Sequence, residues 1–271
     1  MVVLRQKTRK RFGQHWLTDR SVLNKIIEAA DLRVNDRILE IGPGCGALTE
    51  YLVESKANLI HAIELDRDLV DGLRKRFFGQ KNFSLQEGDF LSVEVKPSDG
   101  MPLNKVVANI PYNITSPLLE KLLGNLGKRP EKSYERLVLL MQKEVADRII
   151  ALPGQKNFSA MSVRLQLIAS AKGICDVPPK CFKPSPKVNS KVVVIEPLPF
   201  KDRHDFLIEK RVNFLLKMAF SARRKKLRNT LRGVKPLSDL ERLTERLGIN
   251  LDQRPQELSP IMWVQLAKLL K

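Results

Sequence analysis

"RILEIGPGCGALTEYLVES", residues 37–55, holds an apolar run, a glycine-rich turn and a helical pattern in direct succession. The apolar residues of RILEIG predict a buried strand, and ALTEYLVES predicts the helix that follows it. Gly42, Gly44 and Gly46 permit a tight turn and let a ligand approach the backbone where a side chain would collide. We therefore expect a ligand at this turn, although a purely structural turn would carry the same glycines.

The alternation of strands and helices continues to about residue 145. Apolar runs predict four further strands: NLIHAIELD (58–66), FSLQEGDF (83–90), KVVANI (105–110) and RLVLLM (136–141). RDLVDGLRKRFF (67–78) predicts a helix, and another helix is expected to begin at Thr115 or Ser116. This alternation indicates an α/β fold with a parallel sheet, helices on both faces, and ligands at the carboxyl ends of the strands.

The charge of the chain predicts a polyanionic partner. Lysine and arginine number 48 against 30 acidic residues, which gives a net charge of +18. Nucleic acid and an anionic membrane surface both fit such a charge. No apolar run approaches the ~20 residues that cross a bilayer, and no long amphipathic basic helix stands alone at a terminus. Nucleic acid is therefore favoured, and no membrane partner is expected.

Targeting and metal-binding signals are weak. The N-terminal residues lack the apolar segment of a secretory signal, so we expect a cytoplasmic protein or the mature form of an organellar one. The three cysteines have no Cys-x-x-Cys spacing and the three histidines do not cluster, so no metal site is expected.

The C-terminal part of the chain differs in character. After the prolines at 197–199, residues 201–271 show amphipathic helical patterns and more than twice as many basic as acidic residues. We expect a basic N-terminal arm (1–20), a sheet domain (21–200) and a small all-helical RNA-binding domain (201–271). ARRKKLRNTLR (222–232) predicts a helix with Leu227 and Leu231 facing inward. Its outward basic residues are expected to contact RNA phosphates: Arg223, Arg224, Lys225, Lys226 and Arg228.

Two acidic residues extend the glycine turn into a nucleoside-binding pattern. Glu64 closes the second strand, where its carboxylate can accept both hydroxyls of a ribose. Asp89 closes the third strand and can accept a hydrogen bond from an adenine amine. A dinucleotide site would favour Gly-x-Gly-x-x-Gly. The observed Gly-x-Gly-x-Gly, preceded by Glu40, resembles the first motif of S-adenosylmethionine-dependent methyltransferases.

"NIPY", residues 109–112, ends the fourth strand and resembles the Asn/Asp-Pro-Pro-Tyr motif of enzymes that methylate exocyclic amines. The side-chain oxygen of Asn109 and the carbonyl of Ile110 can each accept one amine hydrogen, which aims the nitrogen lone pair at a methyl group. Pro111 stiffens the turn, and Tyr112 can stack on a base flipped out of its helix. A strand-end Asn with a core Tyr is the alternative without chemistry.

Several stretches together resemble the KsgA/RsmA family of ribosomal RNA adenine dimethyltransferases. They occur in order along nearly the whole chain: RKRFGQHWL, EIGPGCGALT, IELDRDL, ANIPYNITSPLL, LMQKEVADRI, FKPSPKVNSKVV and FSARRKKLRNTL. The resemblance implies a Rossmann-like methyltransferase sheet with a small C-terminal all-helical domain. It also implies S-adenosylmethionine-dependent dimethylation of two adjacent adenines in the 3′-terminal hairpin loop of small-subunit rRNA, acting in ribosome biogenesis.

The resemblance also assigns individual residues. It places cofactor contacts at His15, Leu17, Gly42, Glu64, Asp89 and Asn109. His15 stands where members of the family usually have Asn, and an imidazole can also donate a hydrogen bond. Phe182 would face Tyr112 across the base, with a loop anchor packed under the neighbouring prolines as its alternative. The expected partner is rRNA within a pre-assembled small subunit, bound by a monomer.

Two other classes of function compete with this interpretation. An rRNA-binding assembly factor or a transcription cofactor would need RNA binding more than methyl transfer. The intact NIPY, glycine turn, Glu64 and Asp89 favour retained activity. An NAD-linked dehydrogenase is disfavoured by the glycine spacing and by NIPY.

Overall fold

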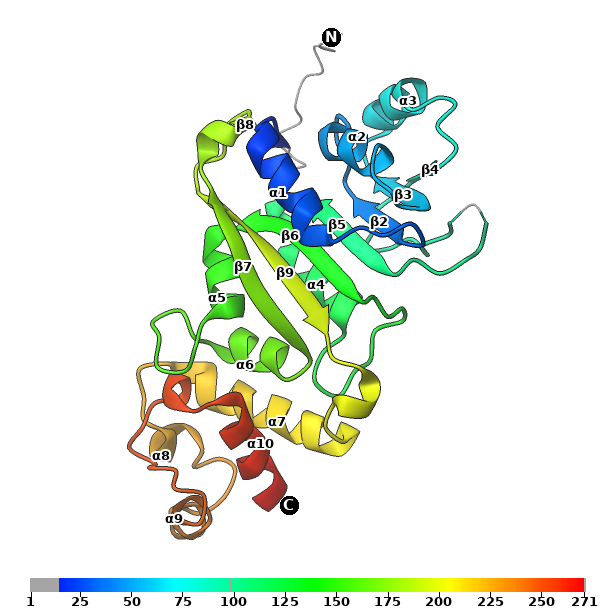
Figure 1. Cartoon of the computed structure of the whole chain (residues 1–271). Coiled ribbons are helices and arrows are strands. Elements are labelled where there is room, and N and C mark those ends of the chain that lie inside the picture. Colours follow the sequence, from blue (N-terminus) through cyan, green and yellow to red (C-terminus); the bar gives the residue numbers. More distant parts are fainter. Residues whose placement is uncertain (1–14, 98, 271) are drawn as a thin grey trace. The chain divides into compact units, whose positions relative to one another are not determined.

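The strand β2 (Arg37–Ile41) runs through the glycine turn into helix α2 (Ala47–Val53), as the sequence predicts. Figure 1 shows the computed structural model, which describes residues 15–97 and 99–270. Most of the predicted N-terminal arm, at residues 1–14, therefore lies outside the described residues.

The four further predicted strands all form. They are β3 (Leu59–Glu64), β4 (Phe83–Glu87), β5 (Lys105–Asn109) and β6 (Arg136–Gln142). With β2 they lie in the order β4-β3-β2-β5-β6, and every pair is parallel. Val106, Val107 and Ala108 are fully buried although successive strand residues point to opposite faces, so both faces of the sheet are covered. The predicted Rossmann-like α/β fold is confirmed.

Two strands that we did not predict extend the sheet beyond β6. β9 (Ser190–Pro197) pairs antiparallel with β6, and β7 (Ala169–Val177) forms the edge, so this sheet has seven strands among the described residues. The predicted strands are therefore parallel to one another, and the antiparallel pairing comes from a strand outside the predicted set. In β7 buried residues stand only at the two ends, and the middle residues are exposed or half-buried. Its apolar pattern was accordingly too weak to indicate a strand.

Helices connect the strands and cover the sheet. They are α1 (Arg20–Ala30), α3 (Arg67–Arg76), α4 (Thr115–Leu123) and α5 (Lys143–Ile150), with a 3₁₀ turn at Tyr112–Ile114. α4 begins at Thr115, as predicted. α1 packs on one face of the sheet with α2, and their apolar residues form one core cluster with Ile38 and Val107.

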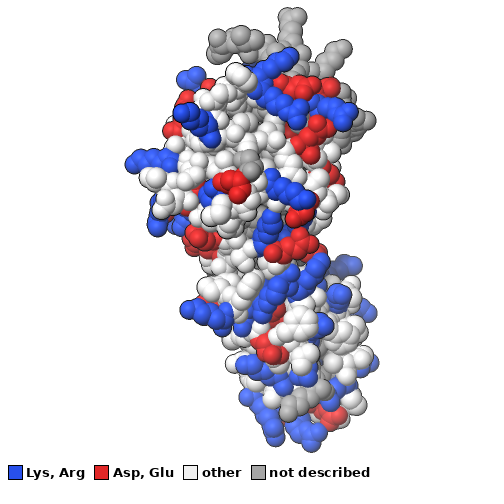
Figure 2. Space-filling model, turned by 90° about the vertical axis from the view of Figure 1, so that its right-hand side faces the viewer, with Lys and Arg blue, Asp and Glu red and all other residues white. Residues whose placement is uncertain are grey.

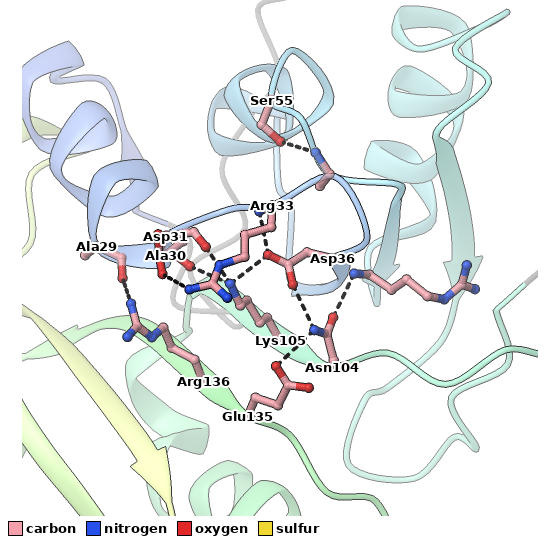
Figure 3. A network of polar contacts seen from close by, with 12 residues as sticks. Ala29, Ala30, Asp31, Arg33, Asp36, Ser55, Asn104, Lys105, Glu135 and Arg136 are labelled. Carbon is pink, nitrogen blue, oxygen red and sulfur yellow. Dashed lines mark hydrogen bonds and ion pairs between the residues drawn. The ribbon is translucent and has the colours of Figure 1, made fainter.

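A polar network fixes the C-terminal end of α1 to the sheet (Figure 3). The ammonium of Lys105, on β5, donates to the carbonyls of Ala30 and Asp31 and lies 2.7 Å from the carboxylate of Asp36. Arg136, on β6, donates to the carbonyl of Ala29 at 3.1 Å. These cations satisfy carbonyls that have no partner inside the helix, and they oppose the negative end of its dipole.

The first described residues are held by a separate two-stranded sheet. β1 (Trp16–Leu17) pairs antiparallel with β8 (Phe182–Lys183), with Leu17 opposite Phe182. The amide of Thr18 continues this pairing by donating to the carbonyl of Cys181. The segment before α1 is thereby fixed to a stretch far along the chain.

The C-terminal helices form a second set of packed elements. They are α6 (Ala160–Gln166), α7 (Phe206–Ala219), α8 (Leu227–Thr230), α9 (Leu237–Glu245) and α10 (Pro260–Leu269). α7 packs on α10, where Trp263 is fully buried. The carboxylate of Glu209 on α7 is buried and accepts two bonds from the guanidinium of Arg203 and one from the amide of Gly127.

The described chain separates into two compact units. The first comprises residues up to 122, 132–146 and 172–196, and the second comprises 123–131, 147–171 and 197 onward. The second unit thus takes in two stretches that precede residue 200, and the predicted division at residues 20 and 200 stays a prediction. None of the helices in the described chain has the length and apolar character that a membrane span requires.

Candidate active site

A cavity opens in the first unit where β2, β3 and β5 end. It is lined by these strand ends, by the turn after β4 and by the first described residues. Parallel strands bring their carboxyl ends to one edge of the sheet, which is why residues so far apart in sequence meet there. The cavity collects all the predicted cofactor and base-contacting residues except Phe182: His15, Leu17, Gly42, Gly44, Glu64, Asp89, Asn109, Ile110, Pro111 and Tyr112.

The glycine turn forms one wall of this cavity. Gly42, Gly44 and Gly46 have φ angles of +67°, +61° and +83°, which side chains rarely adopt. A Cβ on Gly44 would lie 3.1 Å from the indole of Trp16, and one on Gly46 would lie 2.8 Å from the ring of Phe77. The turn therefore requires glycine both for its backbone and for the close packing behind it.

Glu64 links the glycine turn to the start of α3. One carboxylate oxygen accepts the amide of Gly44 at 3.0 Å, and the other accepts the amide of Asp66 at 2.8 Å. Burial raises the pKa of Glu64, and these backbone donors act against that rise. Each carboxylate oxygen can accept a second bond, so Glu64 can hold the turn and still bind two hydroxyls.

Glu40 is a buried carboxyl group beneath the same cavity. The residue lines the cavity, and neither its Oε2 atom nor the buried hydroxyl of Thr49 makes a hydrogen bond of regular geometry among the described residues. Burial, together with the negative charge of Glu64, raises the pKa of Glu40 to about 8, and the hydroxyl of Thr49 acts against that rise. The indole Nε1 of Trp16 is a second buried polar atom on the cavity that lacks a partner in the described chain. A ligand could satisfy both atoms.

Asn109 is positioned by the segment that precedes α1. Its side-chain nitrogen donates to the carbonyl of His15 at 3.1 Å. This bond turns the amide so that its oxygen is left as an acceptor, without a partner in the described structure. Ile110 follows with its own carbonyl, and Pro111 lies 3.8 Å from the position that a Cβ on Gly42 would occupy. The NIPY segment thus lies beside the glycine turn, and Asn109 and Ile110 line the same cavity.

Tyr112 is held at both ends of its side chain. Its hydroxyl lies 2.5 Å from the hydroxyl of Ser190, a fully buried residue at the start of β9. Its ring is stacked with the imidazole of His15, and the Nδ1 of His15 donates to the carbonyl of Pro184 at 2.8 Å. Burial raises the pKa of Tyr112, which keeps the phenol neutral.

Asp89 and two apolar residues form a further part of the cavity lining. One oxygen of Asp89 accepts the amide of Leu91, and the other accepts the hydroxyl of Ser92 at 3.4 Å. Leu65 and Phe90 also line the cavity, and neither was predicted. Each directly follows a predicted acidic residue, so their position next to Glu64 and Asp89 was the signal available in the sequence.

Trp16 and Phe182 differ from what the sequence suggested. Trp16 was not among the residues predicted to contact a ligand, yet it lines the cavity and its indole packs against Gly44. Phe182 is only 2% exposed, packs in the core cluster with Leu17, and does not line the cavity. Phe182 is therefore not on the cavity that Tyr112 lines, and its contact with a base stays a prediction.

The predicted basic helix at residues 222–232 is shorter than expected. Leu227 and Leu231 are fully buried, as predicted, but only Leu227–Thr230 is α-helical. The amides of Leu227 and Arg228 donate to the carbonyls of Gln253 and Leu251 instead of to carbonyls four residues back. Because this pairing partner is distant in sequence, helical periodicity alone could not reveal the break.

The five predicted RNA-binding residues are not equally free. Arg223 donates to the carbonyls of Lys156 and Phe158, while Lys226 and Arg228 both pair with Asp252, at 3.3 and 2.6 Å. Arg224 and Lys225 are exposed and form no ion pair within the described part of the chain. These two side chains are therefore the most available for phosphate groups.

Comparison with known proteins covers both units. A family model described as ribosomal RNA adenine dimethylase matches residues 5–271. The chain belongs to this family. The "Ribosomal RNA small subunit methyltransferase A" of Prochlorococcus marinus (strain MIT 9211) is 66% identical over 260 residues, which are 96% of this chain and 92% of that protein. The protein of the same name from Synechococcus sp. (strain WH7803) is 58% identical, over 96% of this chain and 93% of that protein.

Solved structures of the dimethylase fold agree with this assignment. A dimethyladenosine transferase from Plasmodium falciparum superposes with a TM-score of 0.78 at 27% identity, covering 93% of this chain and 96% of that one. The 23S rRNA methyltransferase ErmE superposes with a TM-score of 0.75 at 25% identity, covering 94% and 99%. The resemblance to the KsgA/RsmA family is therefore confirmed.

Proposed function

We propose that this chain uses S-adenosylmethionine to dimethylate two adjacent adenines in the 3′-terminal hairpin loop of small-subunit rRNA. The family description names adenine dimethylation of ribosomal RNA, and the bacterial relatives are named as small-subunit methyltransferases. The observation that carries the proposal is the placement of Asn109 and Tyr112 on the same cavity as the glycine turn and Glu64. The proposed setting is ribosome biogenesis in the cytoplasm, on a pre-assembled subunit.

The polar groups of the cavity fit the proposed cofactor. Glu64 has free acceptor capacity for the two ribose hydroxyls, and Asp89 can accept a bond from the adenine amine. Gly42 and Gly44 leave their backbone open to a close ligand, and Leu17 would pack near the methionine portion. The apolar side chains of Leu65 and Phe90 would flank the adenine ring.

Two orphaned polar atoms support the presence of a ligand in this cavity. Glu40 Oε2 and Trp16 Nε1 are buried, and both lack partners within the described residues. Buried polar atoms in folded proteins nearly always have a partner. When bound, S-adenosylmethionine supplies an activated methyl group on a positively charged sulfur.

The NIPY segment would prepare the adenine amine for transfer. The lone pair of the amine nitrogen is delocalised into the base, so the free amine is a poor nucleophile. Asn109 Oδ1 and the carbonyl of Ile110 would each accept one amine hydrogen and draw the nitrogen toward a tetrahedral geometry. The ring of Tyr112 would support the flipped base from below. Rate acceleration then comes from positioning for in-line displacement, not from a dedicated general base.

The basic residues of the second unit would bind the RNA backbone. We propose that Arg224 and Lys225 contact phosphates first, because they are exposed and unpaired among the described residues. Arg223, Lys226 and Arg228 would join only where phosphate competes with their present partners. Phe182 could reach a base only if it left the core.

Methyl transfer and cofactor binding can be tested with purified protein. Calorimetry should show binding of S-adenosylmethionine and none of NAD. Small subunits from cells that lack the activity should accept labelled methyl groups from the wild type. Asn109→Ala should abolish or severely slow transfer while still binding subunits, and Asn229→Ala, which truncates an exposed amide on α8, serves as its matched control. Wild-type turnover by Asn109→Ala would refute the role given to the amide.

A further inference from the structure

Helix α7 exposes an apolar and basic face that the proposed reaction does not use. Phe206, Leu207 and Phe214 are 43%, 59% and 51% exposed. Lys210 and Lys217 are also exposed and lie on the same side of the helix, because residues three, four, seven and eight apart share one face. We call these five residues the α7 surface. Isolated exposed phenylalanines are ordinary, but two on one helical face beside a third apolar side chain are not.

The α7 surface is positively charged and has no acidic counterpart on its helix face. Lys210 and Lys217 form no ion pair with any described residue, and neither does Arg211 at the border of the face. The acidic residue inside α7, Glu209, is buried and bonded to Arg203. In the lower part of Figure 2, Lys and Arg cover more of the surface than Asp and Glu, and uncharged residues, drawn white, lie between them.

Contacts with neighbouring residues of the second unit hold the side chain of Lys210 in place. The ammonium of Lys210 lies 4.3 Å from the centre of the Phe206 ring. The stem of Lys210 packs on Gly127, where an added Cβ would approach it to 2.4 Å. The amide of Gly127 in turn donates to buried Glu209. The neighbouring Phe200 is covered in the same way by Arg129, whose guanidinium lies 5.2 Å from the ring centre.

We propose that the α7 surface binds unpaired RNA bases by stacking them on Phe206 and Phe214, with Lys210 and Lys217 contacting the adjoining phosphates. Exposed aromatic rings beside unpaired cations are the two features by which proteins hold single-stranded nucleic acid. An acidic protein would satisfy the cations but would not explain why they alternate with planar rings. This inference rests on the proposed function, because it assumes an RNA substrate. It adds a second RNA-binding surface, on α7, to the base-binding NIPY segment.

The first test compares single-stranded with double-stranded RNA. The probe is a fluorescein-labelled oligouridylate of about 12 nucleotides, whose bases are free to stack on protein, and its partner is an RNA duplex of the same length. In the full-length protein, Phe206→Ala with Phe214→Ala should weaken binding of the single strand by about tenfold or more. Binding of the duplex should change less than twofold, because its bases are not available. Phe78→Ala, which removes a 90% exposed ring from the first unit, is the matched control and should change neither.

The second test separates stacking from charge. The slope of log K against log salt is negative, and Lys210→Gln with Lys217→Gln should reduce its magnitude by about 1.4 units. This value corresponds to two phosphate contacts at about 0.7 each on a single strand. The double phenylalanine variant should leave that slope unchanged. The phenylalanine pair or the lysine pair can each be combined with Arg224→Gln and Lys225→Gln. The losses in RNA-binding free energy should then be additive, because the two sets of residues make separate contacts.

The affinities of the double phenylalanine variant for single-stranded and duplex RNA decide whether the α7 surface stacks bases. Wild-type affinity of the double phenylalanine variant for oligouridylate overturns it, and so does an equal loss for single strand and duplex. Thermal unfolding and calorimetric binding of S-adenosylmethionine should match the wild type, which excludes a folding defect. If the wild type fails to bind S-adenosylmethionine, the proposed function fails while the α7 measurements still stand on their own.

Discussion

The imidazole of His15 lies stacked on the ring of Tyr112, with 5.7 Å between the ring centres and 26° between the planes. The same Tyr112 is proposed to support the flipped adenine, so the imidazole covers a surface that the base would need. The bond from His15 to the carbonyl of Pro184 holds the imidazole in this position. The backbone carbonyl of His15 also orients Asn109, so His15 contacts both residues that are proposed to bind the target base, Tyr112 and Asn109.

His15→Asn should therefore lower the KM for RNA. Asparagine keeps a side-chain donor for the carbonyl of Pro184 but removes the ring that covers Tyr112, and the backbone bond to Asn109 is retained. Affinity for S-adenosylmethionine should change little. Steady-state kinetics on immature small subunits measures both effects, with His204→Asn in the second unit as control. An unchanged or higher KM would show that the imidazole is not displaced by the base.

Ser190 should act as a positioning residue through Tyr112. Ser190→Ala and Tyr112→Phe each leave one hydroxyl without its partner, and an unsatisfied buried hydroxyl costs about 1–3 kcal/mol. The double variant removes both hydroxyls and should be less impaired than the sum of the two single variants. A double-mutant cycle in kcat and in urea-induced unfolding tests this coupling. Additive effects would mean that the 2.5 Å contact does not orient the ring.

Glu64→Ala should weaken S-adenosylmethionine binding at least tenfold, because charge-assisted hydrogen bonds are worth about 1.5–3 kcal/mol each. The structure adds a cost in stability, because the carboxylate also accepts the amides of Gly44 and Asp66. Calorimetry and thermal unfolding measure the two effects. Glu87→Ala, at the facing position of β4, is the control and should keep the affinity.

Glu40 gives a prediction about pH. Its pKa is raised to about 8 in the folded protein against 4.5 ordinarily, so the folded state retains a proton that the unfolded state releases. Between these values stability falls as the pH rises. Glu40→Gln removes this loss, so its free energy of unfolding relative to wild type should increase from pH 5 to pH 8 and level off above. Urea unfolding at several pH values measures the difference. A constant difference would show that Glu40 is not buried in its neutral form.

The sequence was most informative where local chemistry and sheet geometry act together. The apolar runs predicted β2 to β6. The rule that parallel strands end at one edge predicted that Glu64, Asp89 and Asn109 lie close together, and all three line one cavity. The glycines were predictable because their positive φ angles exclude other residues. Each of these inferences needs only a short stretch of chain.

The misses depend on contacts between distant segments. Phe182 is buried because β8 pairs with β1, and Trp16 reaches the cavity because Gly44 leaves room for its indole. The helix at 222–232 breaks because residues 251 and 253 take its amide donors. Asp252 neutralises part of the basic segment from a loop more than twenty residues away. None of these partners can be identified from periodicity or composition.

Primer extension on small-subunit rRNA tests the central claim most directly. Two methyl groups on an adenine amine remove both of its hydrogen-bond donors, so reverse transcriptase should stop at each modified base. We expect stops at two adjacent adenines near the 3′ end in cells that carry this protein and none in cells that lack it. Wild-type protein should restore the stops, and Asn109→Ala should not. Stops that persist in cells without the protein would contradict the proposed function.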